Sequence, residues 1–343
     1  MKEWKAALLA LGVLLAVLAI AAYVSGHRNP AMPGVPPASS APAGMEAYAP
    51  PAPQAAVMQG GPYAHRVMSA SSPDGLTWTP DGSTLLEHAS VPCAVVTPAG
   101  NLRIYYVDAS VVPETANCAE SNDGGKTFQA LGLTIEGLPT EKAVDPSIVL
   151  LPDGRYRLYY FGVTGSPAMA GDHSIYSAIS DDGIHFTQEK DVFRYAGLVD
   201  PDVFWTGTDW MMYVFSIGQG TITARSADGL SFEYAGPLSL QKWGTVAPVS
   251  LGDGRFRLFA FDQPASTMVG SFVSGDLQTW TQEEGTRLSA PDGYQITDPF
   301  VVRMPDGSWK MVFKAQPPQS GMPPPTGRSP GLPQEQPALP RGK

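Results

Sequence analysis

The chain has 343 residues, a formal net charge of −10 and a pI near 4.9. This acidic balance argues against a nucleic-acid partner, because phosphate backbones are bound by clustered Lys and Arg. Residues 27–62 and 317–343 consist largely of Pro, Gly, Ala, Ser and Gln. The remaining stretch of about 250 residues is enough for one all-β domain.

The N-terminal residues 1–26 have the pattern of an export signal. Lys2 and Lys5 precede an uncharged run from Ala6 to Val24. Its length approaches the roughly 20 apolar residues that span a bilayer, and the lysines favour a cytoplasmic N-terminus. Because Ala19-Ile20-Ala21 suits a signal peptidase, both an uncleaved signal anchor and a cleaved signal peptide stay open. The rest of the chain is expected to be extracytoplasmic: membrane-anchored, in the periplasm or at the cell surface, or secreted after cleavage.

Two Pro-rich segments flank the predicted folded domain. Residues 27–62 are expected to form an extended, semi-rigid linker, since Pro favours extended backbone. The tail at 317–343 has the same composition and is expected to be disordered. The domain itself is predicted at residues 63–316.

The domain carries an internal repeat, whose first half is Ser-x-Asp-Gly followed by an aromatic residue. Successive copies of its aspartate are 46 to 59 residues apart. In such a turn the Asp accepts hydrogen bonds from backbone N–H groups, and the aromatic ring packs between sheets. A structural role is therefore expected for Asp74, Asp123, Asp182 and Asp228, with a degraded copy at Asp276.

The second half of the repeat is a residue followed by Pro, an apolar run, a turn and an aromatic strand. Its copies begin at Pro92, Pro146, Pro201, Pro248 and Pro299. A complete unit reads as four short strands in about 50 residues, which is typical of a β-propeller blade. A cation recurs at one position of the aromatic strand and is expected to be a packing or inter-blade feature: Arg103, Arg157, Arg257 and Lys310.

Five copies of each half predict an all-β fold, a five-bladed β-propeller. The domain begins with the third and fourth strands of a blade, at residues 65–86, and ends with first and second strands, at residues 299–314. The two chain ends would complete one blade together, so the ring closes without leaving an open edge strand.

Two motifs resemble known propeller families. The Ser-x-Asp-Gly-x-x-aromatic turn resembles the Asp box, or BNR repeat, of sialidase-like propellers. The openings Val144-Asp145-Pro146 and Val199-Asp200-Pro201 resemble those of five-bladed glycosidases, the arabinanase/xylosidase and invertase/levansucrase families. The resemblance covers roughly residues 65–316. It implies a glycosidase-like propeller with its site at one rim of the central channel.

In this architecture the residue before each Pro lies near the axis, so Asp145, Asp200 and Asp298 are expected to converge as catalytic residues. Converging carboxyl groups raise one another's pKa and divide the acid and base roles that glycoside hydrolysis needs. The family pattern is Asp, Asp and Glu, but the third position here is Val246-Ala247-Pro248, without an acid. A general acid would then come from a loop, with Glu114, Glu120 and Glu141 as candidates.

Four residues on the predicted rim loops are candidates for substrate binding. Trp243 is the best stacking platform for a sugar, whereas His173 reads as a solvated loop residue. The other two are Lys242 and Tyr294. No Cys/His cluster has zinc spacing and no Gly-rich phosphate loop follows a strand. No metal and no cofactor is therefore predicted.

The two cysteines, Cys93 and Cys118, are both on the exported side, where disulfides persist. They fall on the first and third strands of one blade. Those strands lie roughly 10 Å apart, beyond the usual Cα limit for a disulfide. Whether the two thiols pair stays open.

Two functions stay open. The first is an extracytoplasmic glycosidase-like propeller that binds a carbohydrate and, if it is active, hydrolyses it as a glycoside hydrolase. The second is a non-catalytic cell-surface propeller that acts as a binding or scaffold module. The paired Asp-Pro openings favour the first, and the missing third acid favours the second. The expected partners are a carbohydrate or another small-molecule or surface ligand, and the membrane through the N-terminal segment; the chain is expected to be a monomer.

Overall fold

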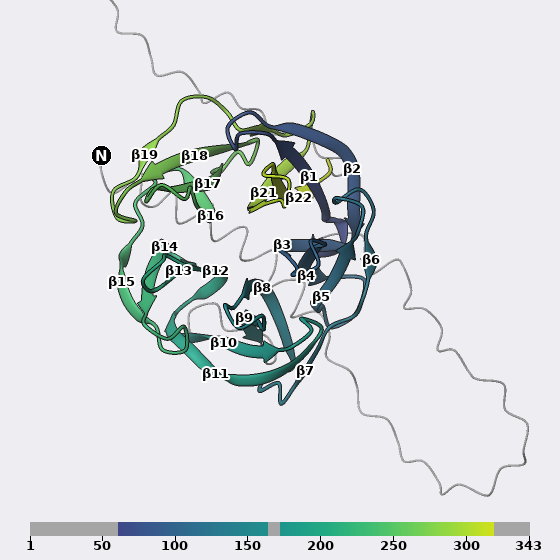
Figure 1. The fold of residues 1–343 in the computed structure, drawn as a ribbon, viewed down its shortest axis with the longest axis vertical. Coiled ribbons are helices and arrows are strands. Elements are labelled where there is room, and N and C mark those ends of the chain that lie inside the picture. The colour runs from purple at the N-terminus through teal and green to yellow at the C-terminus, as the bar shows by residue number, and fades with distance from the viewer. Residues whose placement is uncertain (1–60, 164–171, 319–343) are drawn as a thin grey trace, which may run out of the picture.

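The computed structural model describes residues 61–163 and 172–318, which form five β-sheets arranged in a ring around a central axis (Figure 1). The fold is a five-bladed β-propeller, as the repeat predicts. Its described part contains one 3-10 turn, η2 (Gly61–Ala64), and no α-helix, so none of its helices could cross a membrane. The predicted export signal, the linker up to residue 60 and the tail from residue 319 lie outside the described residues.

Four blades are formed by consecutive strands, numbered here from the first complete blade in the chain. Blade one consists of β3 (Ala89–Val96), β4 (Leu102–Asp108), β5 (Thr115–Ser121) and β6 (Gln129–Ala130). Blade two contains β8 (Lys142–Leu150), β9 (Tyr156–Val163), β10 (Asp172–Ser180) and β11 (His185–Ala196). Blade three contains β12 (Leu198–Trp205), β13 (Trp210–Ser216), β14 (Gly220–Ser226) and β15 (Glu233–Pro237). Blade four contains β16 (Trp243–Ser250), β17 (Phe256–Asp262), β18 (Met268–Ser274), β19 (Thr281–Gln282) and β20 (Leu288–Ser289), the last also paired with β18.

Blade five is shared by the two ends of the domain. It consists of β21 (Gln295–Arg303), β22 (Trp309–Gln316), β1 (Arg66–Ser72) and β2 (Thr79–Glu87). Strand β1 pairs with β22 along its whole length, so the dark first strand and the yellow last strand lie side by side in Figure 1. The predicted ring closure is confirmed, and it joins segments that are more than two hundred residues apart in the chain.

Blade two departs from the predicted four strands. A short strand, β7 (Thr134–Glu136), pairs in parallel with β11 and becomes a fifth strand at the outer edge. Strand β7 lies between Asp123 and Pro146 in the chain. It covers the edge of β11, which would otherwise expose unpaired backbone groups.

The core lies between neighbouring blades, because the second strand of each blade is covered on both faces. Tyr105, Tyr159 and Phe259 are at most 1% exposed. Each of these rings meets, edge to face, the aromatic residue that follows the Ser-x-Asp turn of the next blade: Phe186, Phe232 and Trp78 respectively. The aromatic position of the repeat therefore packs blade against blade, as predicted.

The five Ser-x-Asp turns are held by their own side chains. In blade two, Ser180 donates to Asp182, whose Oδ1 accepts the backbone N–H groups of Ile184 and His185 at 2.8 and 2.9 Å. Gly183 follows with a φ of 74°, and a Cβ there would lie 2.5 Å from Arg103 Nη1. Glycine is therefore required by both the turn and the close approach of the neighbouring blade. The structural role expected for these aspartates is confirmed.

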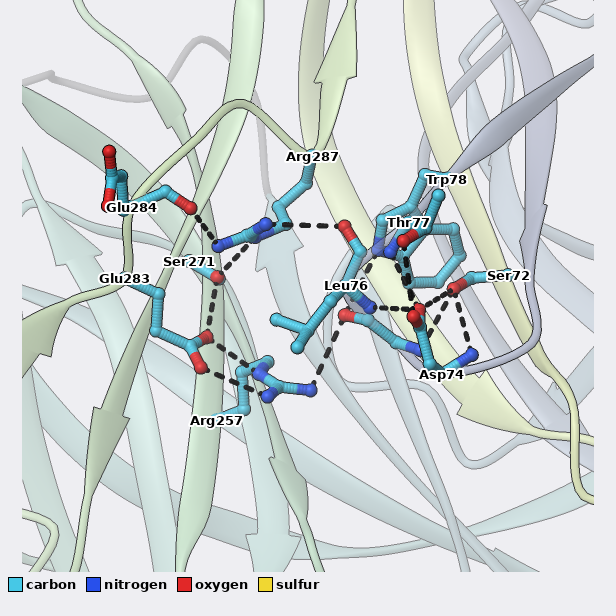
Figure 2. A network of polar contacts seen from close by, with 11 residues as sticks. Ser72, Asp74, Leu76, Thr77, Trp78, Arg257, Ser271, Glu283, Glu284 and Arg287 are labelled. Carbon is cyan, nitrogen blue, oxygen red and sulfur yellow. Dashed lines mark hydrogen bonds and ion pairs between the residues drawn. The ribbon is translucent and has the colours of Figure 1, made fainter.

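Three of the repeated cations join one blade to the next. The Nη1 atoms of Arg103, Arg157 and Arg257 donate to the turn carbonyls of Asp182, Asp228 and Gly75 in the following blade. Each guanidinium also pairs with a carboxylate of its own blade: Glu120, Glu189 and Glu283. Figure 2 shows this inter-blade clamp between blades four and five, where Arg287 adds a bond to the carbonyl of Leu76. The expected inter-blade role is confirmed at these three positions.

The two thiols do not pair. Cys93 and Cys118 are buried and free. Both lie opposite Tyr105 in the strand register, one on each side of β4. An intervening strand separates them by two strand spacings, roughly 10 Å, so this geometry closes the question that the sequence leaves open.

Candidate functional site at the channel rim

A β-bulge near the start of the first strand places one residue of each blade at the channel rim. In four blades the bulged residue has a left-handed backbone, with φ values of 44° to 52° at Val91, Asp145, Asp200 and Asp298. Asp tolerates this region, but a β-branched residue such as Val adopts it rarely. Since Val91 adopts it as well, the bulge belongs to the fold and the carboxylates are not needed to form it. Bulges of this kind re-aim a side chain.

Blade four carries its bulge at a different residue. The register of β16 breaks between Gly244 and Val246, so Thr245 occupies the bulge, two residues before Ala247. The Thr245 hydroxyl donates to Asp298 Oδ1 at 2.8 Å. The residue before the Pro, Ala247, is therefore not the bulged residue in this blade, and the position predicted from the sequence is wrong here. Neither Thr245 nor Ala247 supplies the third acid.

Asp145 and Asp200 of neighbouring blades are joined at the rim by one backbone-to-side-chain hydrogen bond. The backbone N–H of Asp200 donates to Asp145 Oδ2 at 3.4 Å. Burial, together with the charge of Asp298, raises the pKa of Asp145 to about 6. Burial and the charges of Asp145 and Asp298 also raise the pKa of Asp200 well above its usual range. The two groups titrate as one pair, and this pair retains a proton at weakly acidic pH.

Asp298 is kept ionised by a lysine that sequence reasoning missed. Lys314 Nζ lies 2.5 Å from Asp298 Oδ2, and the Thr297 hydroxyl donates to the same oxygen at 3.1 Å. Burial acts to raise the pKa of Asp298, but the charge and hydrogen bond of Lys314 outweigh it and lower the pKa. For Lys314, burial acts to lower the pKa, and the charges of Asp298 and Asp200 outweigh it. The rim therefore combines a proton-holding pair with a buried ion pair.

His65 adds a neutral group beside this cluster. Its Nδ1 lies 3.0 Å from the hydroxyl of Ser90. Burial and the positive charge of Lys314 lower the pKa of His65 to about 4. The imidazole is thus uncharged at neutral pH. No sequence pattern marked His65, because it precedes β1 and only ring closure brings it to the residues of β22.

Two of the residues proposed for substrate binding are less exposed than expected. Trp243 is only 9% exposed, with Phe272 packed edge-on against it and Lys242 Nζ 5.5 Å from the ring centroid. It is therefore a core residue of blade four and offers no open face for stacking. His173 is half-buried in β10, where its ring packs on Phe161 and its Nδ1 lies 3.0 Å from the Leu198 carbonyl. Its expected place in a solvated loop is wrong.

Lys242 and Tyr294 remain accessible at the edges of blades four and five. Lys242 is exposed, and Tyr294 is half-buried with its hydroxyl 3.5 Å from Arg66 Nη1. In the described part of the chain, no hydrogen bond or ion pair joins either residue to Asp145, Asp200 or Asp298. Their role in ligand binding stays a prediction.

The loop acids differ in their surroundings. Glu120 is held by Arg103 and Asn101 in the clamp to the next blade, so it does not serve as an acid at the rim. Glu114 pairs with Lys142 at 2.9 Å, and its charge acts on Asp145. Glu141 is exposed just before β8. Within residues 61–163 and 172–318, no group of three or more His, Cys, Asp or Glu side chains is arranged to hold a metal ion.

No family model matches the sequence, and no curated protein matches it. Solved structures do match in three dimensions. A thermostable family-43 glycoside hydrolase aligns with a TM-score of 0.52 at 15% identity, covering 70% of this chain and 96% of that one. A family-43 β-xylosidase/α-arabinofuranosidase from a compost microbial metagenome, in complex with xylotriose, aligns with a TM-score of 0.52 at 17% identity over 66% and 84%. A protein of unknown function from Dyadobacter fermentans aligns with a TM-score of 0.54 at 18% identity over 73% and 83%.

These similarities concern the fold. At 15 to 18% identity they show that the chain has the architecture of glycosidase-like five-bladed propellers. An activity has to be argued from the site itself, because one fold hosts many functions.

Proposed function

We propose that this propeller binds a carbohydrate at the rim of its channel and hydrolyses a glycosidic bond there. The observation that carries the proposal is the Asp145–Asp200 pair, in which the Asp145 carboxyl accepts the backbone N–H of Asp200 from the next blade and both carboxyl groups have raised pKa values. Glycoside hydrolysis requires one carboxyl group that is protonated and another that is ionised. The fold shared with family-43 enzymes supports the same chemistry.

In this proposal the pair supplies both the acid and the base. The protonated member gives its proton to the glycosidic oxygen as the bond to the anomeric carbon breaks. The ionised member takes a proton from the water that attacks that carbon. Asp298 is 8% exposed and bound by Lys314, Thr245 and Thr297. We therefore assign Asp298 to positioning and to raising the pKa of the pair, although the sequence analysis grouped it with the catalytic residues.

A second candidate function, binding without hydrolysis, is favoured by blade four. Its bulged residue is Thr245 in place of an acid. The experiment that separates the two functions combines a glycan array with a panel of chromogenic glycosides. The proposal predicts turnover that declines below about pH 6, as Asp145 takes up a proton and the pair loses its ionised member. Asp145→Asn should abolish turnover and weaken glycan binding at the rim. Binding to the array without turnover of any glycoside would establish the binding module.

We also propose that the protein is extracytoplasmic and membrane-anchored. The proposal rests on the uncharged run Ala6 to Val24 behind Lys2 and Lys5. Protease added to intact spheroplasts should degrade the propeller, and the protein should sediment with membranes. Recovery of the protein in the cytoplasmic fraction would contradict the proposal.

A further inference from the structure

The five contacts between neighbouring blades are not equivalent. In three of them an Arg on the second strand donates to a Ser-x-Asp turn of the next blade, as described above. Between blades three and four the corresponding residue is Met211, which is buried in one apolar cluster with Leu277 of the facing turn. At that contact, apolar side chains take the place of the polar clamp and fill the space between the two blades.

The contact between blades five and one is different. Its cation forms hydrogen bonds within its own blade and not to the turn of the next blade. The repeated cation there is Lys310, whose Nζ donates to Ser71 at 2.9 Å and to Asp81 at 3.0 Å, both in its own blade. The facing turn of blade one is one residue longer than the others and contains two adjacent glycines, Gly124 and Gly125. Lys is shorter than Arg and lacks its forked guanidinium. In the described part of the chain, Lys310 makes no hydrogen bond to this turn.

A cavity of about 590 Å³ occupies this place. Its volume lies within the range of roughly 300–1,000 Å³ that is usual for small-molecule sites. The walls come from both blades and from the turn between β21 and β22, and they combine charged and hydroxyl groups with apolar surface. The polar side chains of its lining include Asp81, Ser83, Lys126, Asp306, Ser308 and Lys310.

We infer that this cavity, named here the closure pocket, binds a neutral polyhydroxylated molecule of mono- to disaccharide size. Its ammonium groups, Lys126 and Lys310, are matched in number by the carboxylates Asp81 and Asp306, so the lining favours neither an anion nor a cation. A sugar hydroxyl accepts from an ammonium and donates to a carboxylate, and so it satisfies both kinds of group.

Lys310 supplies the most specific contact of the closure pocket. It is 8% exposed, and an ammonium has three donors. Two of them are used within blade five, by Ser71 and Asp81. The third N–H of the ammonium has no hydrogen-bond partner among the described residues, and Lys310 lines the cavity. An oxygen of the ligand would accept this third N–H in place of water. This inference is independent of the site at Asp145 and Asp200.

The test is calorimetric titration of the full chain with D-xylose and xylotriose. The background variant carries Asp145→Asn and Asp200→Asn, so that binding at the channel rim and binding at the closure pocket are measured apart. We expect this background to retain sugar binding. Adding Ser83→Trp, which fills the closure pocket from an exposed strand position, should weaken that binding by roughly tenfold or more. Adding Ser83→Ala is the matched control and should leave it within about threefold.

Lys310→Arg provides a second, independent variant. It restores the residue used in three other contacts, so it should raise the melting temperature and weaken sugar binding together. A variant that still folds and is more stable removes the concern that binding is lost through unfolding. The inference is overturned if neither sugar binds the background variant, or if binding there is unchanged by both Ser83→Trp and Lys310→Arg. Binding of inorganic phosphate that neither sugar displaces would also overturn it, since the closure pocket would then be an anion site.

Discussion

At the scale of single residues, ionisation of the two rim carboxyl groups, Asp145 and Asp200, is unfavourable in the folded protein. Asp145 and Asp200 both have raised pKa values because burial and the charge of Asp298 oppose their ionisation, and the charge of Asp145 adds to the effect on Asp200. A carboxyl whose pKa is higher in the folded protein than in the unfolded chain stabilises the fold at low pH. That contribution is lost as pH rises from about 4 through about 6.

Replacing one member of the pair should therefore stabilise the protein. We expect Asp145→Asn or Asp200→Asn to increase the free energy of unfolding at pH 7 by about 1–3 kcal/mol, since one pKa unit corresponds to about 1.4 kcal/mol. Asn also tolerates the left-handed backbone of the bulge. Thermal melting between pH 4 and pH 8 checks this, and the difference from the natural protein should vanish near pH 4.

The matched control for these variants is Asp182→Asn in a Ser-x-Asp turn. Its carboxylate accepts several hydrogen bonds that lower its pKa against the effect of burial, so this variant should melt earlier than the natural protein. If Asp145→Asn and Asp200→Asn also melt early and bind glycans normally, the rim carboxylates only stabilise the local backbone. The hydrolase proposal then fails.

Lys314 should behave as one half of a buried ion pair. Lys314→Gln leaves Asp298 ionised without its cation, which should lower the free energy of unfolding by about 3–5 kcal/mol at pH 7. The loss should shrink on acidification, because protonated Asp298 no longer needs a partner. The double variant Lys314→Gln/Asp298→Asn should recover part of the stability in denaturant titrations. Equal losses in the single and double variants would show that Lys314 acts by packing alone.

At the scale of the strand and turn, the inter-blade clamp links neighbouring blades through one Arg. Arg157 is 8% exposed, pairs with Glu189 and donates to the Asp228 carbonyl. Arg157→Met should cost about 2–4 kcal/mol, because it leaves a largely buried carboxylate and a carbonyl without their donor. Denaturant melting measures this loss.

Arg155→Met is the control for the clamp. Arg155 also pairs with a carboxylate, Asp153, but both side chains are about half exposed. Exposed ion pairs contribute little to stability, so the melting temperature of this variant should match that of the natural protein. An equal loss in both variants would mean that the clamp carries no special weight.

At the scale of the whole molecule, stability depends on closing the ring. Residues 63–316 should fold cooperatively as a soluble monomer, because all five sheets lie within them. A chain of residues 89–316 lacks β1 and β2 and exposes the edge of β22. We expect it to aggregate or to melt without a cooperative transition. If calorimetry shows that both chains melt alike, closure by the shared blade does not stabilise the fold.

The sequence by itself determined the number of blades, the closure and the meeting of Asp145, Asp200 and Asp298. These follow from one repeated pattern, since equivalent residues of a ring of like units point to the same axis. It did not determine which groups act on those carboxylates. Lys314 looks like one polar residue in a buried strand, His65 lies outside any repeat, and Thr245 reaches the rim through a bulge that no residue marks. Only the tertiary structure decided these contacts, because burial and charge at the rim depend on strands that meet through ring closure and not through proximity in the chain.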